Sequence, residues 1–119
     1  MRPTLIPMTL LAASLSSAAF AHAHLTTATP PVGSTVRTVP TEIAITYSED
    51  VEPKFSAIEV QDASGHRVDA DDVHTAQGNA KRLIVGLKPL APGTYKVIWH
   101  VTSTDTHKTD GSYSFTIAP

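Results

Sequence analysis

The sequence predicts an all-β domain, either an immunoglobulin-like β-sandwich or a small Greek-key β-barrel of about seven short strands. Two observations support this prediction. Apolar and polar residues alternate with a period of two in most segments after residue 22, and no segment there has the period of an amphipathic helix. Turns containing proline or glycine separate these segments over roughly 100 residues, as in small sandwich domains.

The first 21 residues are expected to be a secretory signal peptide that does not belong to the domain. Arg2 precedes an apolar run around Met8–Leu15, and Ala19–Ala21 has the small-x-small form of a cleavage site. A helix that crosses a membrane needs about 20 residues. The apolar run is shorter, which disfavours a segment retained as a membrane anchor. Cleavage after Ala21 leaves residues 22–119 as one mature domain, although cleavage after Ala23 also fits the pattern.

Four strands are expected in the first half of the domain. The clearest alternation places Ile43, Ile45 and Tyr47 on one face of a half-buried strand. Pro30 ends the segment before it, since proline cannot donate to a strand ladder. The four expected strands are Leu25–Thr29, Glu42–Ser48, Ala57–Asp62 and Arg67–Asp69.

Three strands are expected in the second half, where the turn-rich segment Lys88–Gly93 separates the first from the second. Alternation in the second strand puts Trp99 among inward residues, so this side chain is expected in the core. The last strand alternates in the same way, with Phe115 at the middle of its apolar face. The three expected strands are Arg82–Leu87, Thr94–Val101 and Gly111–Ile117.

Composition narrows the range of functions. Without the leader the chain keeps eight Lys or Arg and eleven Asp or Glu residues, a formal charge of −3, and no basic cluster suggests nucleic acid binding. The sequence contains no cysteine, so packing or a bound ion must provide the stability that disulfides give many small exported domains. Met1 and Met8 both leave with the leader, so the mature chain has no sulfur ligand.

A possible metal-binding motif, Asp105-Thr106-His107, lies between the last two expected strands. In extended chain, Asp105 and His107 point to the same side with Cα atoms about 6.6 Å apart, at about 3.3 Å per residue. Metal bonds to oxygen or nitrogen are about 2 Å long, so both side chains can reach one ion. By itself the motif is more typical of a solvated turn than of a metal site.

The predicted cleavage site adds a second set of ligands, because it makes His22 the first residue. The α-amine and Nδ1 of an N-terminal histidine chelate one metal ion, and an imidazole opposite completes a histidine brace, which suits Cu(II). His107 can supply that imidazole and Asp105 an oxygen ligand. His24 is a competing ligand, because an amine, two backbone amides and an imidazole at position three also form a Cu(II) chelate.

Several short motifs occur in a fixed order along the whole mature length. They are His22–Leu25, Tyr47–Glu49, Phe55–Ala57, Leu90–Trp99 and Ser103–Phe115. Together these motifs resemble the CopC family of periplasmic copper-binding proteins, which are associated with copper resistance. The resemblance implies a Greek-key barrel or sandwich in which His22, Asp105 and His107 bind Cu(II), with Glu49 as an outer ligand or in contact with the ligands.

The resemblance also implies a function. It suggests a periplasmic, monomeric carrier or buffer of one Cu(II) ion per chain, without enzymatic activity, that serves copper homeostasis or resistance. A CopD-type inner-membrane copper transporter is the partner that the family suggests. Some family members hold Cu(I) in a methionine-rich loop, but the corresponding region here, Gln61–Ala80, contains no methionine. We therefore expect Cu(II) binding only.

Two alternatives remain at this stage. A copper-dependent oxidoreductase of the lytic polysaccharide monooxygenase type also uses a histidine brace on a β-sandwich. It needs an exposed aromatic platform for sugar, whereas nearly all aromatic residues here fall at inward strand positions, and an anionic Asp105 favours Cu(II) over Cu(I). A plain immunoglobulin-like adhesion module leaves the N-terminal histidine and the Asp-x-His motif without a role.

Overall fold

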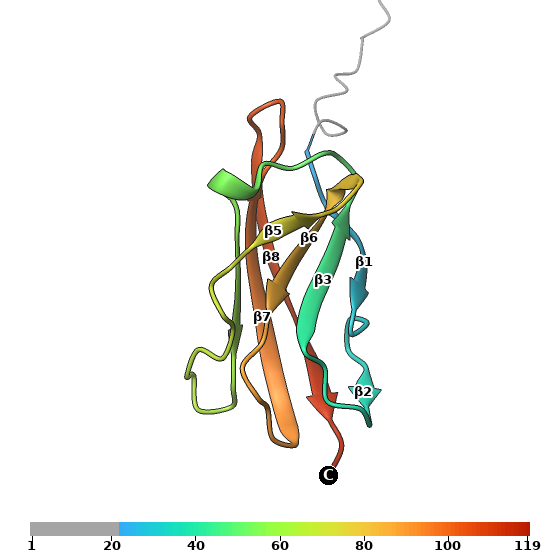
Figure 1. Cartoon of the computed structure of the whole chain (residues 1–119), viewed down its shortest axis with the longest axis vertical. Coiled ribbons are helices and arrows are strands. Elements are labelled where there is room, and N and C mark those ends of the chain that lie inside the picture. The colour runs from blue at the N-terminus through green and yellow to red at the C-terminus, as the bar shows by residue number, and fades with distance from the viewer. Residues whose placement is uncertain (1–21) are drawn as a thin grey trace, which may run out of the picture.

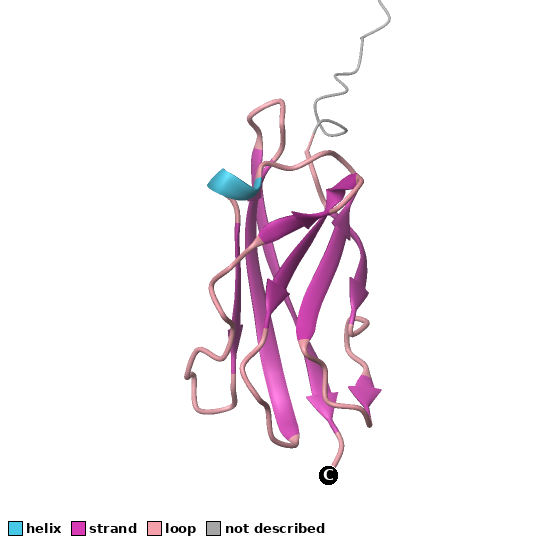
Figure 2. Ribbon diagram, in the orientation of Figure 1, coloured by secondary structure: helices cyan, strands magenta, loops and turns pink. Residues whose placement is uncertain are grey.

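Two four-stranded β-sheets stack face to face, with the hydrophobic core between them (Figure 1). The structure is a computed structural model that describes residues 22–119, and the predicted signal peptide, residues 1–21, lies outside the described residues. In the described part of the chain the only helical element is a short 3-10 turn, η2 (Pro53–Phe55) (Figure 2). The prediction of an all-β fold is therefore confirmed.

The first sheet is antiparallel and has the strand order β1-β3-β6-β5. Its strands are β1 (Leu25–Thr29), β3 (Glu42–Tyr47), β6 (Asn79–Gly86) and β5 (His74–Ala76). The second sheet has the order β2-β8-β7-β4, in which β2 is parallel to β8 and the other pairs are antiparallel. Its strands are β2 (Thr35–Val36), β8 (Lys108–Ile117), β7 (Gly93–Thr102) and β4 (Ala57–Gln61). The ladders are separate, so the fold is a sandwich rather than a closed barrel.

The structure corrects the predicted strands in several places. Strands β2 and β5 were not predicted, because two and three residues are too few to show alternation. The predicted strand Arg67–Asp69 is wrong, since these residues form only isolated bridges to Gln61 and Leu87. This segment crosses from the edge of β4 to the end of β6, and therefore links the two sheets instead of extending either one.

The predicted inward faces are buried, as alternation indicated. Trp99 on β7 is 7% exposed and lies edge-on to Tyr47 on β3, with ring centroids 5.2 Å apart. Tyr95 on β7 stacks on Phe115 of β8 at a centroid distance of 5.5 Å. Among residues 22–119, Phe55 on η2 is the one large aromatic residue that is exposed, with 69% of its surface accessible. The aromatic side chains therefore build the core and do not form a surface platform.

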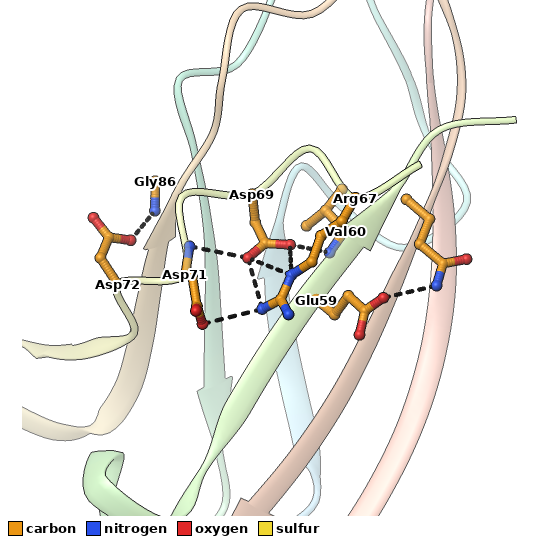
Figure 3. Close-up of polar contacts among 8 residues, drawn as sticks. Glu59, Val60, Arg67, Asp69, Asp71, Asp72 and Gly86 are labelled. Atoms are coloured by element: carbon orange, nitrogen blue, oxygen red, sulfur yellow. Dashed lines mark hydrogen bonds and ion pairs between the residues drawn. The ribbon is translucent and has the colours of Figure 1, made fainter. Parts of the chain in front are cut away.

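The segment that links the sheets is held by a buried carboxylate (Figure 3). Asp69 is 3% exposed, and its Oδ1 accepts hydrogen bonds from Nε of Arg67 and from the backbone N–H of Val60, both at 2.9 Å. Its Oδ2 accepts from the N–H of Asp71 at 3.0 Å. Burial alone would raise the pKa of Asp69, but the hydrogen bonds from Arg67 and Val60 outweigh it and hold this pKa below its ordinary value.

We expect the free energy of unfolding to decrease as the pH falls below about 4, the ordinary pKa of an aspartate. Because folding lowers the pKa of Asp69, the unfolded chain takes up the proton first on acidification. The contribution of Asp69 to the free energy of unfolding is thus complete above the ordinary pKa of aspartate. It is lost as the pH falls through the lowered pKa of the folded state. Urea unfolding at several pH values measures this slope, which should be flatter in Asp69→Asn. An equal slope in both proteins would mean that other carboxylates cause the loss of stability at low pH.

Candidate metal centre

Three parts of the chain meet at one end of the sandwich, where the β7–β8 hairpin lies beside the first described residues (Figure 1). The end of β3 joins them, because the N–H of Ser48 donates to the carbonyl of His24 at 2.9 Å. The hydroxyl of Thr109 on β8 donates to the carbonyl of Ala23 at 2.6 Å. This end of the sandwich carries the residues predicted as ligands or their neighbours, which are His22, His24, Glu49, Asp105 and His107.

The β7–β8 hairpin sets the relative position of Asp105 and His107. The N–H of Ser103 donates to the carbonyl of His107 at 2.9 Å, which closes a three-residue loop. Thr106 ends this loop in the left-handed conformation, with φ of +74°, as is common for loops of this length. The predicted extended conformation of the motif is therefore wrong. A β-branched residue is strained at this φ, so strain is located between the two predicted ligands.

Asp105 and His107 contact each other despite the turn. Nδ1 of His107 lies 3.3 Å from Oδ1 of Asp105, and the same oxygen accepts a hydrogen bond from the hydroxyl of Ser103. The Ser103 hydrogen bond, and after it the contacts with His107, hold the pKa of Asp105 below its ordinary value, so this carboxylate is ionised at neutral pH. The contact therefore places an imidazole nitrogen of His107 next to an ionised carboxylate oxygen of Asp105.

The fold brings His22 against His107, although these residues lie at opposite ends of the mature sequence. Their ring centroids are 4.7 Å apart, and the ring planes are tilted by 34°. His22 is half-buried, whereas the side chain of His107 is 45% exposed. Within residues 22–119, no group of three or more His, Cys, Asp or Glu side chains is arranged to hold a metal ion. The side chains thus provide a histidine pair beside a carboxylate.

The residues that follow His22 are fixed in place. Ala23 is fully buried and belongs to the hydrophobic core. The N–H of His24 donates to Oγ of Ser48 at 3.0 Å, and Nδ1 of the His24 ring lies 3.1 Å from the same oxygen. The His24 side chain is therefore engaged with Ser48, the residue after β3, at the protein surface.

Glu49 follows Ser48 at the end of β3 and is half-buried. Its position places it at the same end of the sandwich as the histidine pair. Among residues 22–119 its carboxylate forms no hydrogen bond or ion pair with the other predicted ligands.

Sequence reasoning missed three residues that organise this end of the molecule. Ser103 could have been found, since a serine two positions before an aspartate in a turn often bonds to that side chain or its backbone. Ser48 and Thr109 carried no such signal, because their partners, His24 and Ala23, lie far away in the sequence.

Comparison with known proteins gives consistent matches. Residues 25–118 match the CopC domain family. Protein YobA of Escherichia coli K12 is 38% identical over 99 residues, which cover 82% of this chain and 80% of YobA. In the described residues, 22–119, no helix is long and apolar enough to cross a membrane.

Two crystal structures share the fold. CopC from Methylosinus trichosporium OB3b superimposes with a TM-score of 0.77 at 30% identity, covering 82% of this chain and 95% of that one. PcoC from Escherichia coli, described as a methionine-rich copper resistance protein, superimposes with a TM-score of 0.71 at 31% identity, covering 81% and 98% of the two chains.

Proposed function

The chain belongs to the CopC family, whose members are copper-binding carriers rather than enzymes, and we propose that it carries one Cu(II) ion in the periplasm. The ligands in this proposal are the α-amine and Nδ1 of His22, an imidazole nitrogen of His107 and a carboxylate oxygen of Asp105. The contact between the rings of His22 and His107, 4.7 Å apart beside Asp105, is the observation that supports it most directly.

Processing completes this site. Cleavage after Ala21 frees the α-amine of His22, which supplies the nitrogen that no side chain provides. Cleavage after Ala23 is disfavoured, because Ala23 is fully buried and its carbonyl accepts a hydrogen bond from Thr109. Removing it would open a hole in the core and leave the new N-terminal residue, His24, attached to Ser48.

The oxidation state follows from the donor set. Nitrogen and carboxylate ligands suit Cu(II), whereas Cu(I) prefers thiolate or thioether sulfur. The sequence after residue 21 contains neither cysteine nor methionine, in contrast to PcoC, which is described as methionine rich. We infer that a reductant combined with a Cu(I) chelator strips the metal.

The fold favours the brace over the chelate formed by His22, Ala23 and His24. That chelate uses the backbone nitrogens of Ala23 and His24 as ligands. In the structure Ala23 is buried, and the N–H of His24 already donates to Ser48. Forming the chelate would therefore pull the first residues out of the sandwich, whereas the brace leaves them in place.

The oxidoreductase alternative finds no support in the site. The aromatic residues that could bind sugar, among them Trp99 and Tyr47, are buried, and Phe55 alone does not make a flat platform. We also propose, from family membership, that the protein acts as a monomer and passes copper to a CopD-type membrane transporter.

The proposal is tested by intact-mass measurement of the exported protein with and without one equivalent of Cu(II). We expect a mature chain that begins at His22 and gains the mass of one copper ion. We also expect copper to raise the melting temperature, because the unfolded chain lacks the converged ligands. A mature chain beginning at Thr26 or later, or one that melts identically with and without saturating Cu(II), would contradict a site built into the fold.

A further inference from the structure

We propose that Thr109 is a positioning residue of the copper site, whose hydroxyl holds the N-terminal segment so that His22 stays against His107. This inference rests on the proposed function, because it assumes that His22 and His107 bind Cu(II) together. Thr109 is not itself a proposed ligand of the metal. It acts through the backbone of the residue that follows His22.

Thr109 is the second residue of β8 and His107 lies just before the strand, two positions earlier, so their side chains project to similar sides of the chain. The ring of His107 contacts the ring of His22, and the hydroxyl of Thr109 donates to the carbonyl of Ala23 at 2.6 Å. One short stretch of chain thus holds two consecutive residues of the N-terminus. The contact also joins the two layers, because Ala23 leads into β1 of one sheet and Thr109 lies in β8 of the other.

The opposite side of the N-terminal segment is held by Ser48, the residue after β3. The N–H of His24 donates to Oγ of Ser48 at 3.0 Å, and the N–H of Ser48 donates to the carbonyl of His24 at 2.9 Å. The side chain of Ala23 is fully buried between these attachments. We call the hydrogen bonds from Thr109 to Ala23 and between Ser48 and His24 the N-terminal clamp. With the clamp closed, His22 directly precedes a residue whose carbonyl is held in place.

The clamp also bears on which copper complex forms. The competing chelate needs the backbone nitrogens of Ala23 and His24, so it requires these residues to leave their places. Each clamp bond opposes that movement, and the Thr109 bond acts directly on the peptide group between Ala23 and His24. Loss of this hydroxyl should therefore weaken the brace and make the chelate easier to form. Preorganisation of ligands by their neighbours commonly has this effect on metal affinity.

The test uses three variants of the exported protein, each shown by mass to begin at His22. Thr109→Val removes the hydroxyl while keeping the branched shape, and Thr109→Ser keeps a hydroxyl on a smaller side chain. Thr116→Val is the matched control, because Thr116 is a half-buried threonine near the other end of β8 whose hydroxyl pairs with Thr94 at 3.0 Å. Competition titration gives the Cu(II) affinity, and the visible d–d band reports the coordination mode.

For Thr109→Val we expect an affinity lower by about tenfold or more, as is typical for loss of an outer partner of a metal ligand. We also expect its d–d band to shift to shorter wavelength, because deprotonated amides are strong-field donors. Thr109→Ser should restore both properties, and Thr116→Val should match the wild type. A purely structural role for Thr109 would change the melting temperature without moving the band.

The outcomes separate this inference from the proposed function. The role of Thr109 would be refuted, and the proposed function kept, if the wild type shows the brace spectrum and Thr109→Val has the same affinity and the same d–d band. Failure of Thr109→Val to fold, while Thr109→Ser folds, would refute it as well, by assigning the hydroxyl to stability. A wild-type protein that begins at His22 and binds no Cu(II), or that already shows the short-wavelength band, would instead refute the proposed function.

Discussion

Replacing His107 with alanine is expected to lower the Cu(II) affinity of the mature protein by at least about 100-fold, more than the loss of an outer partner usually costs. The variant loses the imidazole that lies 4.7 Å from the ring of His22. Some Cu(II) should remain bound through the α-amine, the amides and His24. The residual complex should absorb at shorter wavelength, because two deprotonated amides replace the imidazole and the carboxylate.

The His24→Ala variant makes this prediction selective. In the proposed site His24 is not a ligand, and its ring is engaged with Ser48, so the substitution should change affinity little. His100→Ala is a suitable control, since His100 is an exposed histidine on β7 that is not among the proposed ligands. If His24→Ala alone abolishes tight binding in a protein that begins at His22, the assignment of His107 and Asp105 as ligands is wrong.

Replacing Gly111 with alanine is expected to destabilise the fold by about 3 kcal/mol, at the upper end of the usual cost of overpacking a core. Gly111 lies opposite Trp99 in the β7–β8 ladder, and the indole ring covers its Cα. A Cβ at this position would lie 2.5 Å from Cζ2 and 2.8 Å from Cε2 of Trp99, well inside van der Waals contact. The ring cannot easily move away, because it packs edge-on against Tyr47 in the core.

Urea unfolding with tryptophan fluorescence measures this effect. Gly86→Ala is the matched control, because Gly86 also lies in a strand and a Cβ there would meet the side chain of Asp72 at 3.3 Å. That carboxylate is exposed and can shift, so we expect a cost below about 1 kcal/mol. Equal stability of Gly111→Ala and the wild type would show that the indole does not rest on the backbone of β8.

Much of the fold could be predicted from local patterns. Alternation with a period of two is a property of the chain itself, so it identified the buried faces of β3, β7 and β8 and placed Trp99 in the core. Strands β2 and β5 could not be predicted, because such short segments are extended only through the partners that the fold provides. The prediction of a strand at Arg67–Asp69 failed for a related reason, because this segment links the two sheets and its conformation depends on both of them.

The candidate site divides in the same way. The sequence by itself determined which groups are available to a metal, namely a histidine at a predicted cleavage site, an Asp-x-His motif and no sulfur after residue 21. Only the tertiary structure decided which of them meet. Packing of the two sheets places the residues before β1 beside the β7–β8 hairpin, so that His22 reaches His107 while His24 is engaged with Ser48. Contacts between residues this far apart depend on how the sheets stack, and no local pattern encodes that arrangement.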